Sequence, residues 1–390
     1  MTIAGPNSEV CASLDMARVP VPAFVVDLSR LKRNLEFLRT VKQRAGCKIL
    51  LAQKGFAMWA TYPVISSYLD GTCSSGPWEA MLAREKFPGE CHVYSPAFTA
   101  EDIGEILPFA DHVSFNSVRQ WRTFLPRIKA AGRAIECALR VNPQVTTGAV
   151  AMYDPCAAGS RLGIPASELQ DEDLSGLDGL HFHTLCEQNA DALEITLAGV
   201  EEKFGHLLHR VKWLNMGGGH HITRADYDVE LLIRLVREVR ERYDVEVYLE
   251  PGEAIALGTG ILVSSVIDTV RNHMDIGILD VSVTCHMPDC LEMPYRPDIR
   301  GSGLEGEKPH LWRLGGGTCL AGDVIGDYSF DAPLNRGDRL VFEDMAHYTM
   351  VKTTMFNGIK HPAICTWDPD TGELKVVRRF RYEDFRDRLS

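Results

Sequence analysis

Short apolar segments alternate with amphipathic helical patterns through the middle of the chain, and this alternation constrains the fold most. Patterns such as 78–86 and 227–242 have helical spacing and follow strand-like segments. Eight strand–helix units predict an α/β fold, a (β/α)8 barrel. The weakest unit is the loop-rich stretch 142–178, and long loops of this kind usually carry function. The predicted strands are Lys48–Ala52, Gly71–Ser74, His92–Tyr94, His112–Phe115, Glu136–Val141, Gly179–Thr184, Trp213–Met216 and Glu246–Glu250.

After Glu250 the helical patterns stop, and strand patterns follow. A short strand at 24–27, before a helical pattern over 28–44, lies outside the barrel count and could pair into the later sheet. The sequence therefore predicts a barrel over 30–260 and a β-rich domain formed by 1–29 together with 261–390. The strands expected in that domain are 261–270, 276–283, 339–343, 363–367 and 374–380.

Composition restricts the function of the chain. A net charge of -12 argues against nucleic acid as a partner and is compatible with a small cationic substrate. The 11 cysteines contain no CxxC pair, which favours reduced thiols in the cytoplasm over disulfides or a zinc site. We expect neither a signal peptide nor a membrane span, because the first residues lack the charged and apolar regions of a leader, and no run of ~18 apolar residues occurs.

Lys54 follows the first predicted strand and is followed at once by a glycine. The C-terminal ends of barrel strands face the active site, so we expect a lysine there to be partly desolvated. Desolvation lowers a lysine pKa and makes the amine a nucleophile that can form a Schiff base. Taken alone, the same pattern more often marks a surface lysine at the start of a loop.

Two later strand ends carry candidate binding groups. Gly217, Gly218 and Gly219 lack every Cβ, so their N–H groups could converge on an anion such as a phosphate. A tight turn is the alternative. Glu250 would point a carboxylate into the barrel mouth, where burial demands a partner. A protonated pyridine nitrogen is one such partner, and a turn-capping role is the alternative.

Four further residues are ambiguous when each is taken alone. His181 and His183 lie two apart on one predicted strand and would face the same way. No trusted ligand spacing follows them, so we expect no metal. One of them could instead pack flat on a planar cofactor, or both could be core residues. Cys319, in a glycine-rich segment, and Tyr348, in a strand-like one, are more typical of an inert thiol and a packing residue.

Together and in this order, the segments resemble the fold-type III pyridoxal-phosphate enzymes, the group of ornithine decarboxylase and alanine racemase. The resemblance covers nearly the whole chain. Within the group, the sequence of these segments most resembles that of the carboxynorspermidine and carboxyspermidine decarboxylases. The segments that carry it are LAQKGFA (51–57), SSGPWEA (74–80), NMGGGHHIT (215–223), EPGEA (250–254), CHMPDCLEMPYRP (285–297), GGTCLAGD (316–323) and a tyrosine followed by TxFNG (348–358).

The resemblance implies pyridoxal 5'-phosphate as the cofactor and assigns a role to each matching residue. Lys54 would form the Schiff base with the cofactor, and His183 would stack on its pyridine ring. Glu250 would pair with the ring nitrogen. The phosphate would be held by Gly217, Gly218, Gly219 and Tyr348.

The resemblance also implies a homodimer in which each second domain completes the partner's site. Cys319 and Asp323 would reach across the interface, and Cys319 would protonate the substrate carbon. Asp289, Glu292 and Asp323 are candidates for the ammonium groups of a polyamine substrate, and Arg296 is a candidate for its carboxylate. Each of these four residues could equally be a solvated loop charge.

The implied reaction is decarboxylation of carboxynorspermidine or carboxyspermidine to norspermidine or spermidine, in polyamine biosynthesis. The chain departs from the wider group at Glu253, where many members have arginine, and at Leu320, where many have an acid. The alternatives are a decarboxylase of diaminopimelate, ornithine or arginine, and a non-catalytic pyridoxal-phosphate-binding protein. The last is disfavoured because such proteins lack a β-rich second domain.

Overall fold

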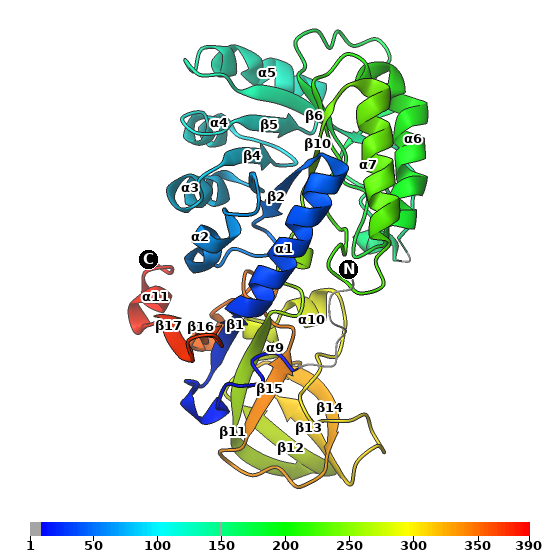
Figure 1. Cartoon of the computed structure of the whole chain (residues 1–390). Coiled ribbons are helices and arrows are strands. Elements are labelled where there is room, and N and C mark those ends of the chain that lie inside the picture. The colour runs from blue at the N-terminus through cyan, green and yellow to red at the C-terminus, as the bar shows by residue number, and fades with distance from the viewer. Residues whose placement is uncertain (1–8, 149) are drawn as a thin grey trace. The chain divides into compact units, whose positions relative to one another are not determined.

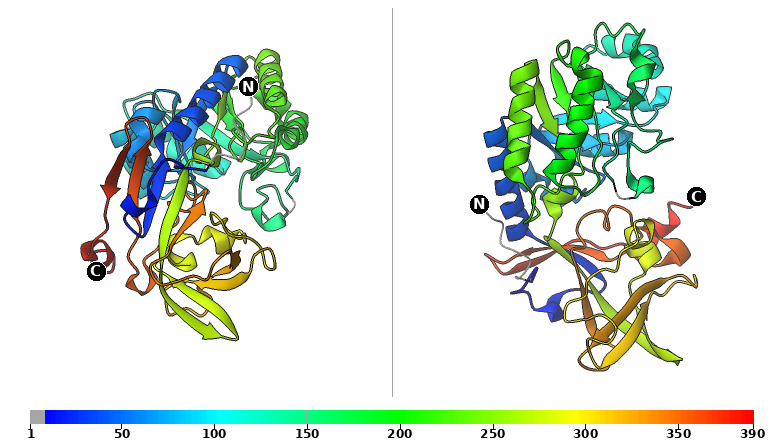
Figure 2. Two further views of the ribbon diagram at one scale, coloured as in Figure 1. Left: turned by 60° about the horizontal axis from the view of Figure 1, so that its bottom comes forward. Right: turned by 90° about the vertical axis from the view of Figure 1, so that its right-hand side faces the viewer.

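The structure is a computed structural model that describes residues 9–148 and 150–390. Two compact units are drawn in Figure 1 and, from further directions, in Figure 2. Asn34–Ile255 forms the first unit, and 9–33 together with Ala256–Ser390 forms the second. None of the helices in the described residues is long and apolar enough to cross a membrane.

Eight parallel strands of the first unit close into a barrel, which confirms the predicted (β/α)8 architecture. Neighbouring strands follow the order β5-β4-β3-β2-β10-β9-β8-β6, and pairing between β5 and β6 closes the ring. The short β7 (Ile164–Pro165) pairs with β6 outside the ring. The barrel strands are β2 (Lys48–Ala52), β3 (Gly71–Ser74), β4 (Glu90–Tyr94), β5 (His112–Phe115), β6 (Glu136–Asn142), β8 (Gly179–His181), β9 (Trp213–Asn215) and β10 (Glu246–Leu249).

Amphipathic helices surround these strands (Figure 1). In α7 (Val229–Tyr243), Leu232, Val236 and Val239 recur at helical spacing and are buried, while Asp228 caps the first turn by accepting from the N–H of Leu231. The other helices of this region are α1 (Leu28–Ala45), α2 (Tyr62–Ile65), α3 (Pro77–Lys86), α4 (Ala100–Ile106), α5 (Val118–Lys129), α6 (Ala190–Leu208) and α8 (Glu253–Ala256), with short η2 (Trp59–Thr61), η3 (Ala151–Tyr153) and η4 (Ala166–Leu169).

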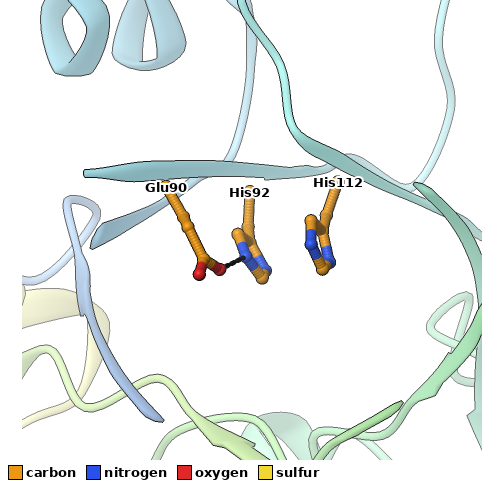
Figure 3. A group of neighbouring side chains, drawn as sticks. All are labelled: Glu90, His92 and His112. Atoms are coloured by element: carbon orange, nitrogen blue, oxygen red, sulfur yellow. Dashed lines mark hydrogen bonds and ion pairs between the residues drawn. The ribbon is translucent and has the colours of Figure 1, made fainter. Parts of the chain in front are cut away.

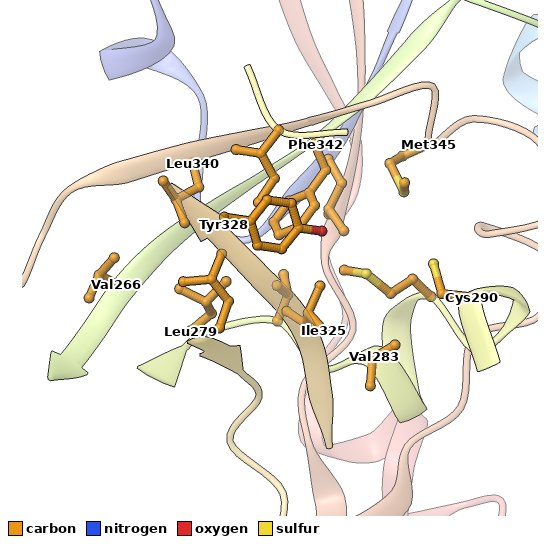
Figure 4. Packing of buried hydrophobic residues seen from close by; sticks show 14 of the residues in the cluster. Val266, Leu279, Val283, Cys290, Ile325, Tyr328, Leu340, Phe342 and Met345 are labelled. Atoms are coloured by element: carbon orange, nitrogen blue, oxygen red, sulfur yellow. The ribbon is translucent and has the colours of Figure 1, made fainter. Parts of the chain in front are cut away.

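The second unit is built on a mixed sheet whose strands follow the order β14-β13-β12-β11-β1-β16-β17, with β15 paired to β11. The early strand β1 is antiparallel to β11 and parallel to β16, so the expected pairing into the β-rich domain is confirmed. Figure 4 shows apolar side chains of this unit packed together, Phe342 and Tyr328 among them. The strands are β1 (Ala23–Asp27), β11 (Gly260–Asn272), β12 (Met274–Leu279), β13 (His310–Gly315), β14 (Val324–Phe330), β15 (Arg339–Glu343), β16 (Ala363–Asp368) and β17 (Glu373–Arg378).

The second unit differs from the prediction in three ways. Helices do not stop after Glu250, and the strand expected over 276–283 ends at Leu279. Ser282 instead caps a helix, because its hydroxyl accepts from the N–H of Cys285. Strands β13 and β14 were not predicted, since polar residues interrupt their apolar pattern. The helices here are η1 (Met16–Arg18), α9 (Val283–His286), α10 (Asp289–Glu292), η5 (Phe356–Gly358) and α11 (Tyr382–Arg386).

Candidate active site

Lys54 lies in the turn that follows β2, where the N–H of Gly55 donates to the carbonyl of Ala52 over 3.0 Å. Its side chain is exposed in the chain, so the expected partial desolvation is wrong. The ammonium charge nevertheless acts on the barrel mouth, because it contributes to lowering the pKa of His183. Lys54 therefore stands at a strand's C-terminal end as an accessible amine beside other predicted site residues.

The glycine loop that follows β9 leaves no room for side chains. A Cβ at Gly217 would lie 2.6 Å from the carbonyl oxygen of Phe182, and one at Gly219 would lie 2.1 Å from that of Leu185. Both residues also adopt left-handed φ angles, +70° and +80°. The N–H of Gly217 donates to Oδ1 of Asn215, whereas the N–H of Gly219 has no partner in the described residues. The expectation that all three N–H groups face an anion is therefore wrong.

His183 lies beyond the end of β8, which stops at His181, so the two histidines do not share a strand as predicted. Its Nδ1 accepts a 2.7 Å hydrogen bond from the N–H of Gly218. A backbone N–H can only donate, so the ring proton must lie on Nε2. Burial, and then the charges of Lys54 and Arg140, hold the pKa of His183 well below its usual value. The imidazole is therefore neutral and fixed at one edge.

Glu250 follows β10 and is buried, with a side chain 8% exposed. Asn215 Nδ2 donates to Oε1 over 2.6 Å, and Nε2 of His181 lies 3.6 Å from Oε2. Burial raises the pKa of Glu250, but His181, Asn215 and the Cys73 thiol outweigh it and bring the pKa below its usual value. The group is therefore a carboxylate held at the end of a barrel strand.

Sequence reasoning missed Asn215, Cys73 and Arg140. Asn215 lies in register beside His181 of β8 and Tyr248 of β10, which places its amide next to the residues after those strands. An amide side chain at a strand end can hydrogen-bond to two neighbouring groups. The position of Asn215 just before the glycines could therefore have marked it as a site residue. The buried Arg140 donates to the carbonyl of His183 over 3.1 Å and stacks on Tyr94, 4.6 Å from the ring centroid.

Two clusters of the first unit contain potential metal ligands. At the N-terminal ends of β4 and β5, His92 and His112 stack 3.9 Å apart with 15° between their planes, and Glu90 hydrogen-bonds to His92 (Figure 3). The nitrogen lone pairs of two stacked rings lie in two separate, nearly parallel planes, so they do not point at one common ion. Lys48 also pairs with Glu90 over 2.6 Å. This cluster is better explained as a charge network.

The second cluster contains Glu187, His221 and Glu253. Nδ1 of His221 faces the guanidinium of Arg224 at 3.2 Å, and its Nε2 lies 3.0 Å from Oε2 of Glu253. The guanidinium can only donate, so Nε2 carries the proton and donates to the carboxylate. Glu253, one of the two positions at which the chain departs from the group it resembles, thus belongs to an imidazole–carboxylate pair.

In the second unit, Cys319 lies in the loop between β13 and β14 and is the exposed one of the 11 cysteines. Asp323 closes the same loop but is only 5% exposed, and its carboxylate accepts four hydrogen bonds within this unit. Tyr348 lies in a bend after β15, not in the strand-like setting expected, and has a φ of +48°. That angle is unfavourable for an aromatic residue and typical of functional segments.

The three remaining substrate candidates have different surroundings within the second unit. Asp289 is 7% exposed, and its Oδ1 has no hydrogen-bond partner in the described residues. Glu292 is paired with Lys352 over 2.5 Å. The guanidinium of Arg296 donates to two carbonyl oxygens and covers the ring of Tyr328 at 3.8 Å, so it is already occupied.

The barrel residues fit pyridoxal phosphate. A pyridinium nitrogen would find a buried carboxylate at Glu250, and a phosphate would find the Gly219 N–H beside a backbone that no Cβ obstructs. The chain matches the family described as "Pyridoxal-dependent decarboxylase, C-terminal sheet domain" over residues 23–346. It therefore belongs to the pyridoxal-dependent decarboxylase family, as the motifs predicted.

Its relatives within that family are similar over almost their full length. The chain is 45% identical to a carboxyaminopropylagmatine decarboxylase of Synechocystis sp., covering 96% of each chain. It is 42% identical to a carboxynorspermidine/carboxyspermidine decarboxylase of Campylobacter jejuni, covering 94% of this chain and 98% of that one. The crystal structure of carboxynorspermidine decarboxylase from Campylobacter jejuni, complexed with norspermidine, superposes with a TM-score of 0.88 at 42% identity, covering 95% and 100% of the two chains.

Proposed function

We propose that this chain removes CO2 from carboxynorspermidine and carboxyspermidine and releases norspermidine and spermidine, using pyridoxal phosphate. The observation that carries the proposal is Glu250, a buried strand-end carboxylate whose pKa lies below its usual value. The similarity to the Campylobacter jejuni enzyme supports the substrate. When bound, the cofactor supplies an electron-accepting ring that makes loss of an α-carboxylate possible.

The barrel residues would then divide the work as follows. Lys54 attaches the cofactor through its accessible amine. Glu250 holds a proton on the pyridine nitrogen, because its own proton affinity is low and that of the ring is raised by the adjacent charge. His183, kept neutral and turned by Gly218, packs against the ring without adding a charge. The Gly219 N–H and Tyr348 contribute to holding the phosphate.

Substrate recognition would rest on Asp289. A buried carboxylate oxygen without a partner is costly, and a substrate ammonium group would satisfy it. Its other oxygen already accepts from Tyr295 over 2.7 Å and Thr349 over 3.1 Å, so the side chain is fixed before a substrate arrives. Glu292 is a weaker candidate, because a polyamine would have to displace Lys352.

A second substrate is carboxyaminopropylagmatine, favoured by the Synechocystis relative. The two kinds of substrate share a carboxyaminopropyl group and differ at the far end, where agmatine carries a guanidinium. A guanidinium prefers two carboxylate oxygens side by side, whereas Asp289 offers one. We therefore rank the polyamine substrates first.

We also propose that Cys319 is the acid that protonates the product carbon, and that it serves the site of the partner in a homodimer. The exposure of Cys319 on its loop supports an intermolecular role. A two-fold dimer would make both exchanges equivalent and give two complete sites.

A substrate panel tests the proposed function. CO2 release and product mass are measured for carboxynorspermidine, carboxyspermidine, carboxyaminopropylagmatine, diaminopimelate, ornithine and arginine. We expect kcat/KM for the first two to exceed that for the amino acids by at least ~100-fold, the size of effect that one buried ion contact supports. A higher kcat/KM on carboxyaminopropylagmatine would transfer the assignment to that substrate, and comparable rates on diaminopimelate would reject both.

A further inference from the structure

The carboxylate of Asp323 has no capacity left for a substrate. Oδ1 accepts from the hydroxyl of Ser282 and the N–H of Val283, both over 2.9 Å. Oδ2 accepts from the N–H of Thr318 over 3.1 Å and from its hydroxyl over 2.7 Å. An ionised carboxylate offers about four acceptor sites, and all of them are used. A substrate ammonium could bind only by breaking one of these bonds inside a buried pocket.

These four bonds join the residue before Cys319 to the start of α9. Thr318 is held on one side of the carboxylate, and the first turn of α9 is held on the other. The loop is also tight around this group, because a Cβ at Gly316 would lie 2.4 Å from Oδ2 of Asp323. Asp323 thus fixes the position of the loop backbone next to the thiol.

Asn357 holds the backbone of Cys319, the residue that follows Thr318. Its Oδ1 accepts a 2.8 Å hydrogen bond from the N–H of Cys319 itself. Asn357 has a left-handed backbone, with φ 57° and ψ 13°, which asparagine tolerates better than most side chains. Its segment is tied to α9 as well, since the N–H of Thr354 donates to the carbonyl of Cys285 over 2.8 Å. The TxFNG motif and the cysteine loop are therefore both hydrogen-bonded to α9.

We propose that Asp323 and Asn357, together the Cys319 clamp, are positioning residues that aim the Cys319 thiol, and that neither binds substrate. This inference rests on the proposed role of Cys319 as the acid. A thiol on a loose loop would sample many directions, and proton transfer demands a short, aligned approach. The clamp leaves the side chain of Cys319 exposed while it holds the backbone directly before its Cα, at Thr318 and at the N–H of Cys319.

The clamp can be tested with substitutions that separate its hydrogen bonds from the backbone geometry. Asn357→Gly keeps the left-handed angle accessible but removes the acceptor, whereas Asn357→Asp keeps an acceptor oxygen. Asp323→Asn keeps the shape but turns an NH2 group toward two donors. Asp244→Gly is the matched control, because Asp244 also has a left-handed backbone, φ 53°, at the end of α7.

The first measurement is amide hydrogen exchange of the holoenzyme, which does not depend on turnover. We expect the Cys319 N–H to exchange roughly tenfold faster in Asn357→Gly and at the wild-type rate in Asn357→Asp and Asp244→Gly. Asp323→Asn should speed exchange at Thr318 or at Val283, whichever of the two N–H groups then faces the NH2 group. Unchanged exchange at Cys319 in Asn357→Gly would show that the side chain does not hold this backbone, and would overturn the proposal.

The second measurement is a double-mutant cycle on kcat and KM. Asn357→Gly should lower kcat roughly fivefold to tenfold with KM unchanged, Asp323→Asn should lower it further, and Asn357→Asp should restore it. In a Cys319→Ala background, neither Asn357→Gly nor Asp323→Asn should lower kcat again, because residues that act through one group are not additive. Should Asp323→Asn fail to fold, Asn357→Gly carries the cycle alone.

An equal further loss in the Cys319→Ala background would mean that the clamp residues act elsewhere, and a raised KM in Asp323→Asn would return that residue to the substrate site. Either result overturns the proposal while leaving the proposed function intact. Full activity of Cys319→Ala would instead remove the proposed acid, and the aiming role with it. Wild-type enzyme without turnover on the panel would reject the proposed function by itself.

Discussion

Asn215 joins Glu250 to the glycine loop: its Nδ2 donates to Oε1 of Glu250 over 2.6 Å, and its Oδ1 accepts from the N–H of Gly217 over 2.8 Å. One buried amide therefore sets the position of the carboxylate and of the loop at the same time. The two parts proposed to hold opposite ends of the cofactor cannot shift independently.

This link allows the charge of Glu250 to be removed without disturbing its position. Glu250→Gln still presents an oxygen to Asn215, but a neutral amide cannot keep a pyridine nitrogen protonated. We expect kcat, measured as CO2 release, to fall roughly 100- to 1000-fold. The cofactor should stay bound, which its visible absorbance measures. Glu246→Gln, at the other end of β10, is the control and should change kcat less than about twofold. An unaltered kcat in Glu250→Gln would reduce Glu250 to a turn residue.

Lys54 should be the attachment point of the cofactor. Borohydride reduction of the wild-type enzyme should leave the cofactor covalently bound to the peptide that contains Lys54, and Lys54→Ala should lose this label. Peptide mass mapping identifies the labelled residue. Lys48→Arg, at the opposite end of the same strand, should keep the label at Lys54. Label on any other peptide in the wild type would exclude Lys54.

Shared sites predict complementation between two inactive chains. In a mixed dimer, Lys54→Ala of one chain and Cys319→Ala of the other fall in the same shared site, so the second site remains intact. With random exchange about half the dimers are mixed, and activity should recover to ~25% of wild type. Mixing is followed by mass spectrometry to confirm subunit exchange. No recovery after confirmed exchange would place both residues in the site of one chain.

Asp289 should determine affinity for the cationic end of the substrate. Asp289→Asn keeps the shape but removes the charge, and a lost charged hydrogen bond corresponds to roughly 10- to 100-fold in KM. Steady-state kinetics with carboxyspermidine measure this, and kcat should change little. Glu292→Gln is the comparison, expected to raise KM less because its carboxylate is paired with Lys352. A larger KM effect at Glu292 would reverse the two roles.

His112 should make the barrel sensitive to acid. Burial, and then the neighbouring His92, lower the pKa of His112 to about 2 from 6.5. As the pH falls below about 6.5, the unfolded chain takes up a proton at this position and the folded chain does not, so the folded state loses stability. Between pH 7 and pH 5 the loss is about 2 kcal/mol.

Urea unfolding at both pH values should therefore show a smaller acid loss in His112→Gln, by about that amount, than in the wild type. His209→Gln changes an exposed histidine and should leave the difference unaltered. Equal acid losses in all three proteins would show that His112 is protonated in the fold, which its stacked contact with His92 opposes.

The barrel could be predicted because its strands are buried on both faces, and runs such as 49–52 are therefore continuously apolar. Strands β13 and β14 could not, because their solvent face carries charges such as Arg313 and Asp327, which pair with each other over 2.8 Å and interrupt the apolar run. Such strands are fixed by cross-strand contacts that a single segment does not contain.

The candidate site likewise contains features that could be predicted from the sequence and features that could not. Lys54, Glu250 and the glycines follow strand ends, so topology alone brings them to one rim of the barrel. Other features of the site depend on partners that are distant in sequence. These features are the hydrogen bond of Asn215 to Glu250, the tautomer of His183 and the four hydrogen bonds of Asp323, one of which comes from Ser282. Charge and residue type marked Asp323 and Arg296 as ligands, but only the contacts reveal that both are already engaged.

The position of β1 in the second sheet has a consequence for how the chain is made. The barrel unit is continuous from Asn34 to Ile255, so all of its strands can pair while later residues are still being synthesised. Strand β1 leaves the ribosome before any barrel strand, yet its parallel partner β16 begins at Ala363, close to the end of the chain. Strand Ala23–Asp27 must therefore remain unpaired on that edge until Ala363 and the residues after it have been synthesised. We therefore expect the second unit to assemble more slowly than the barrel, and the cysteine loop that it carries to be positioned only after β16 has been synthesised.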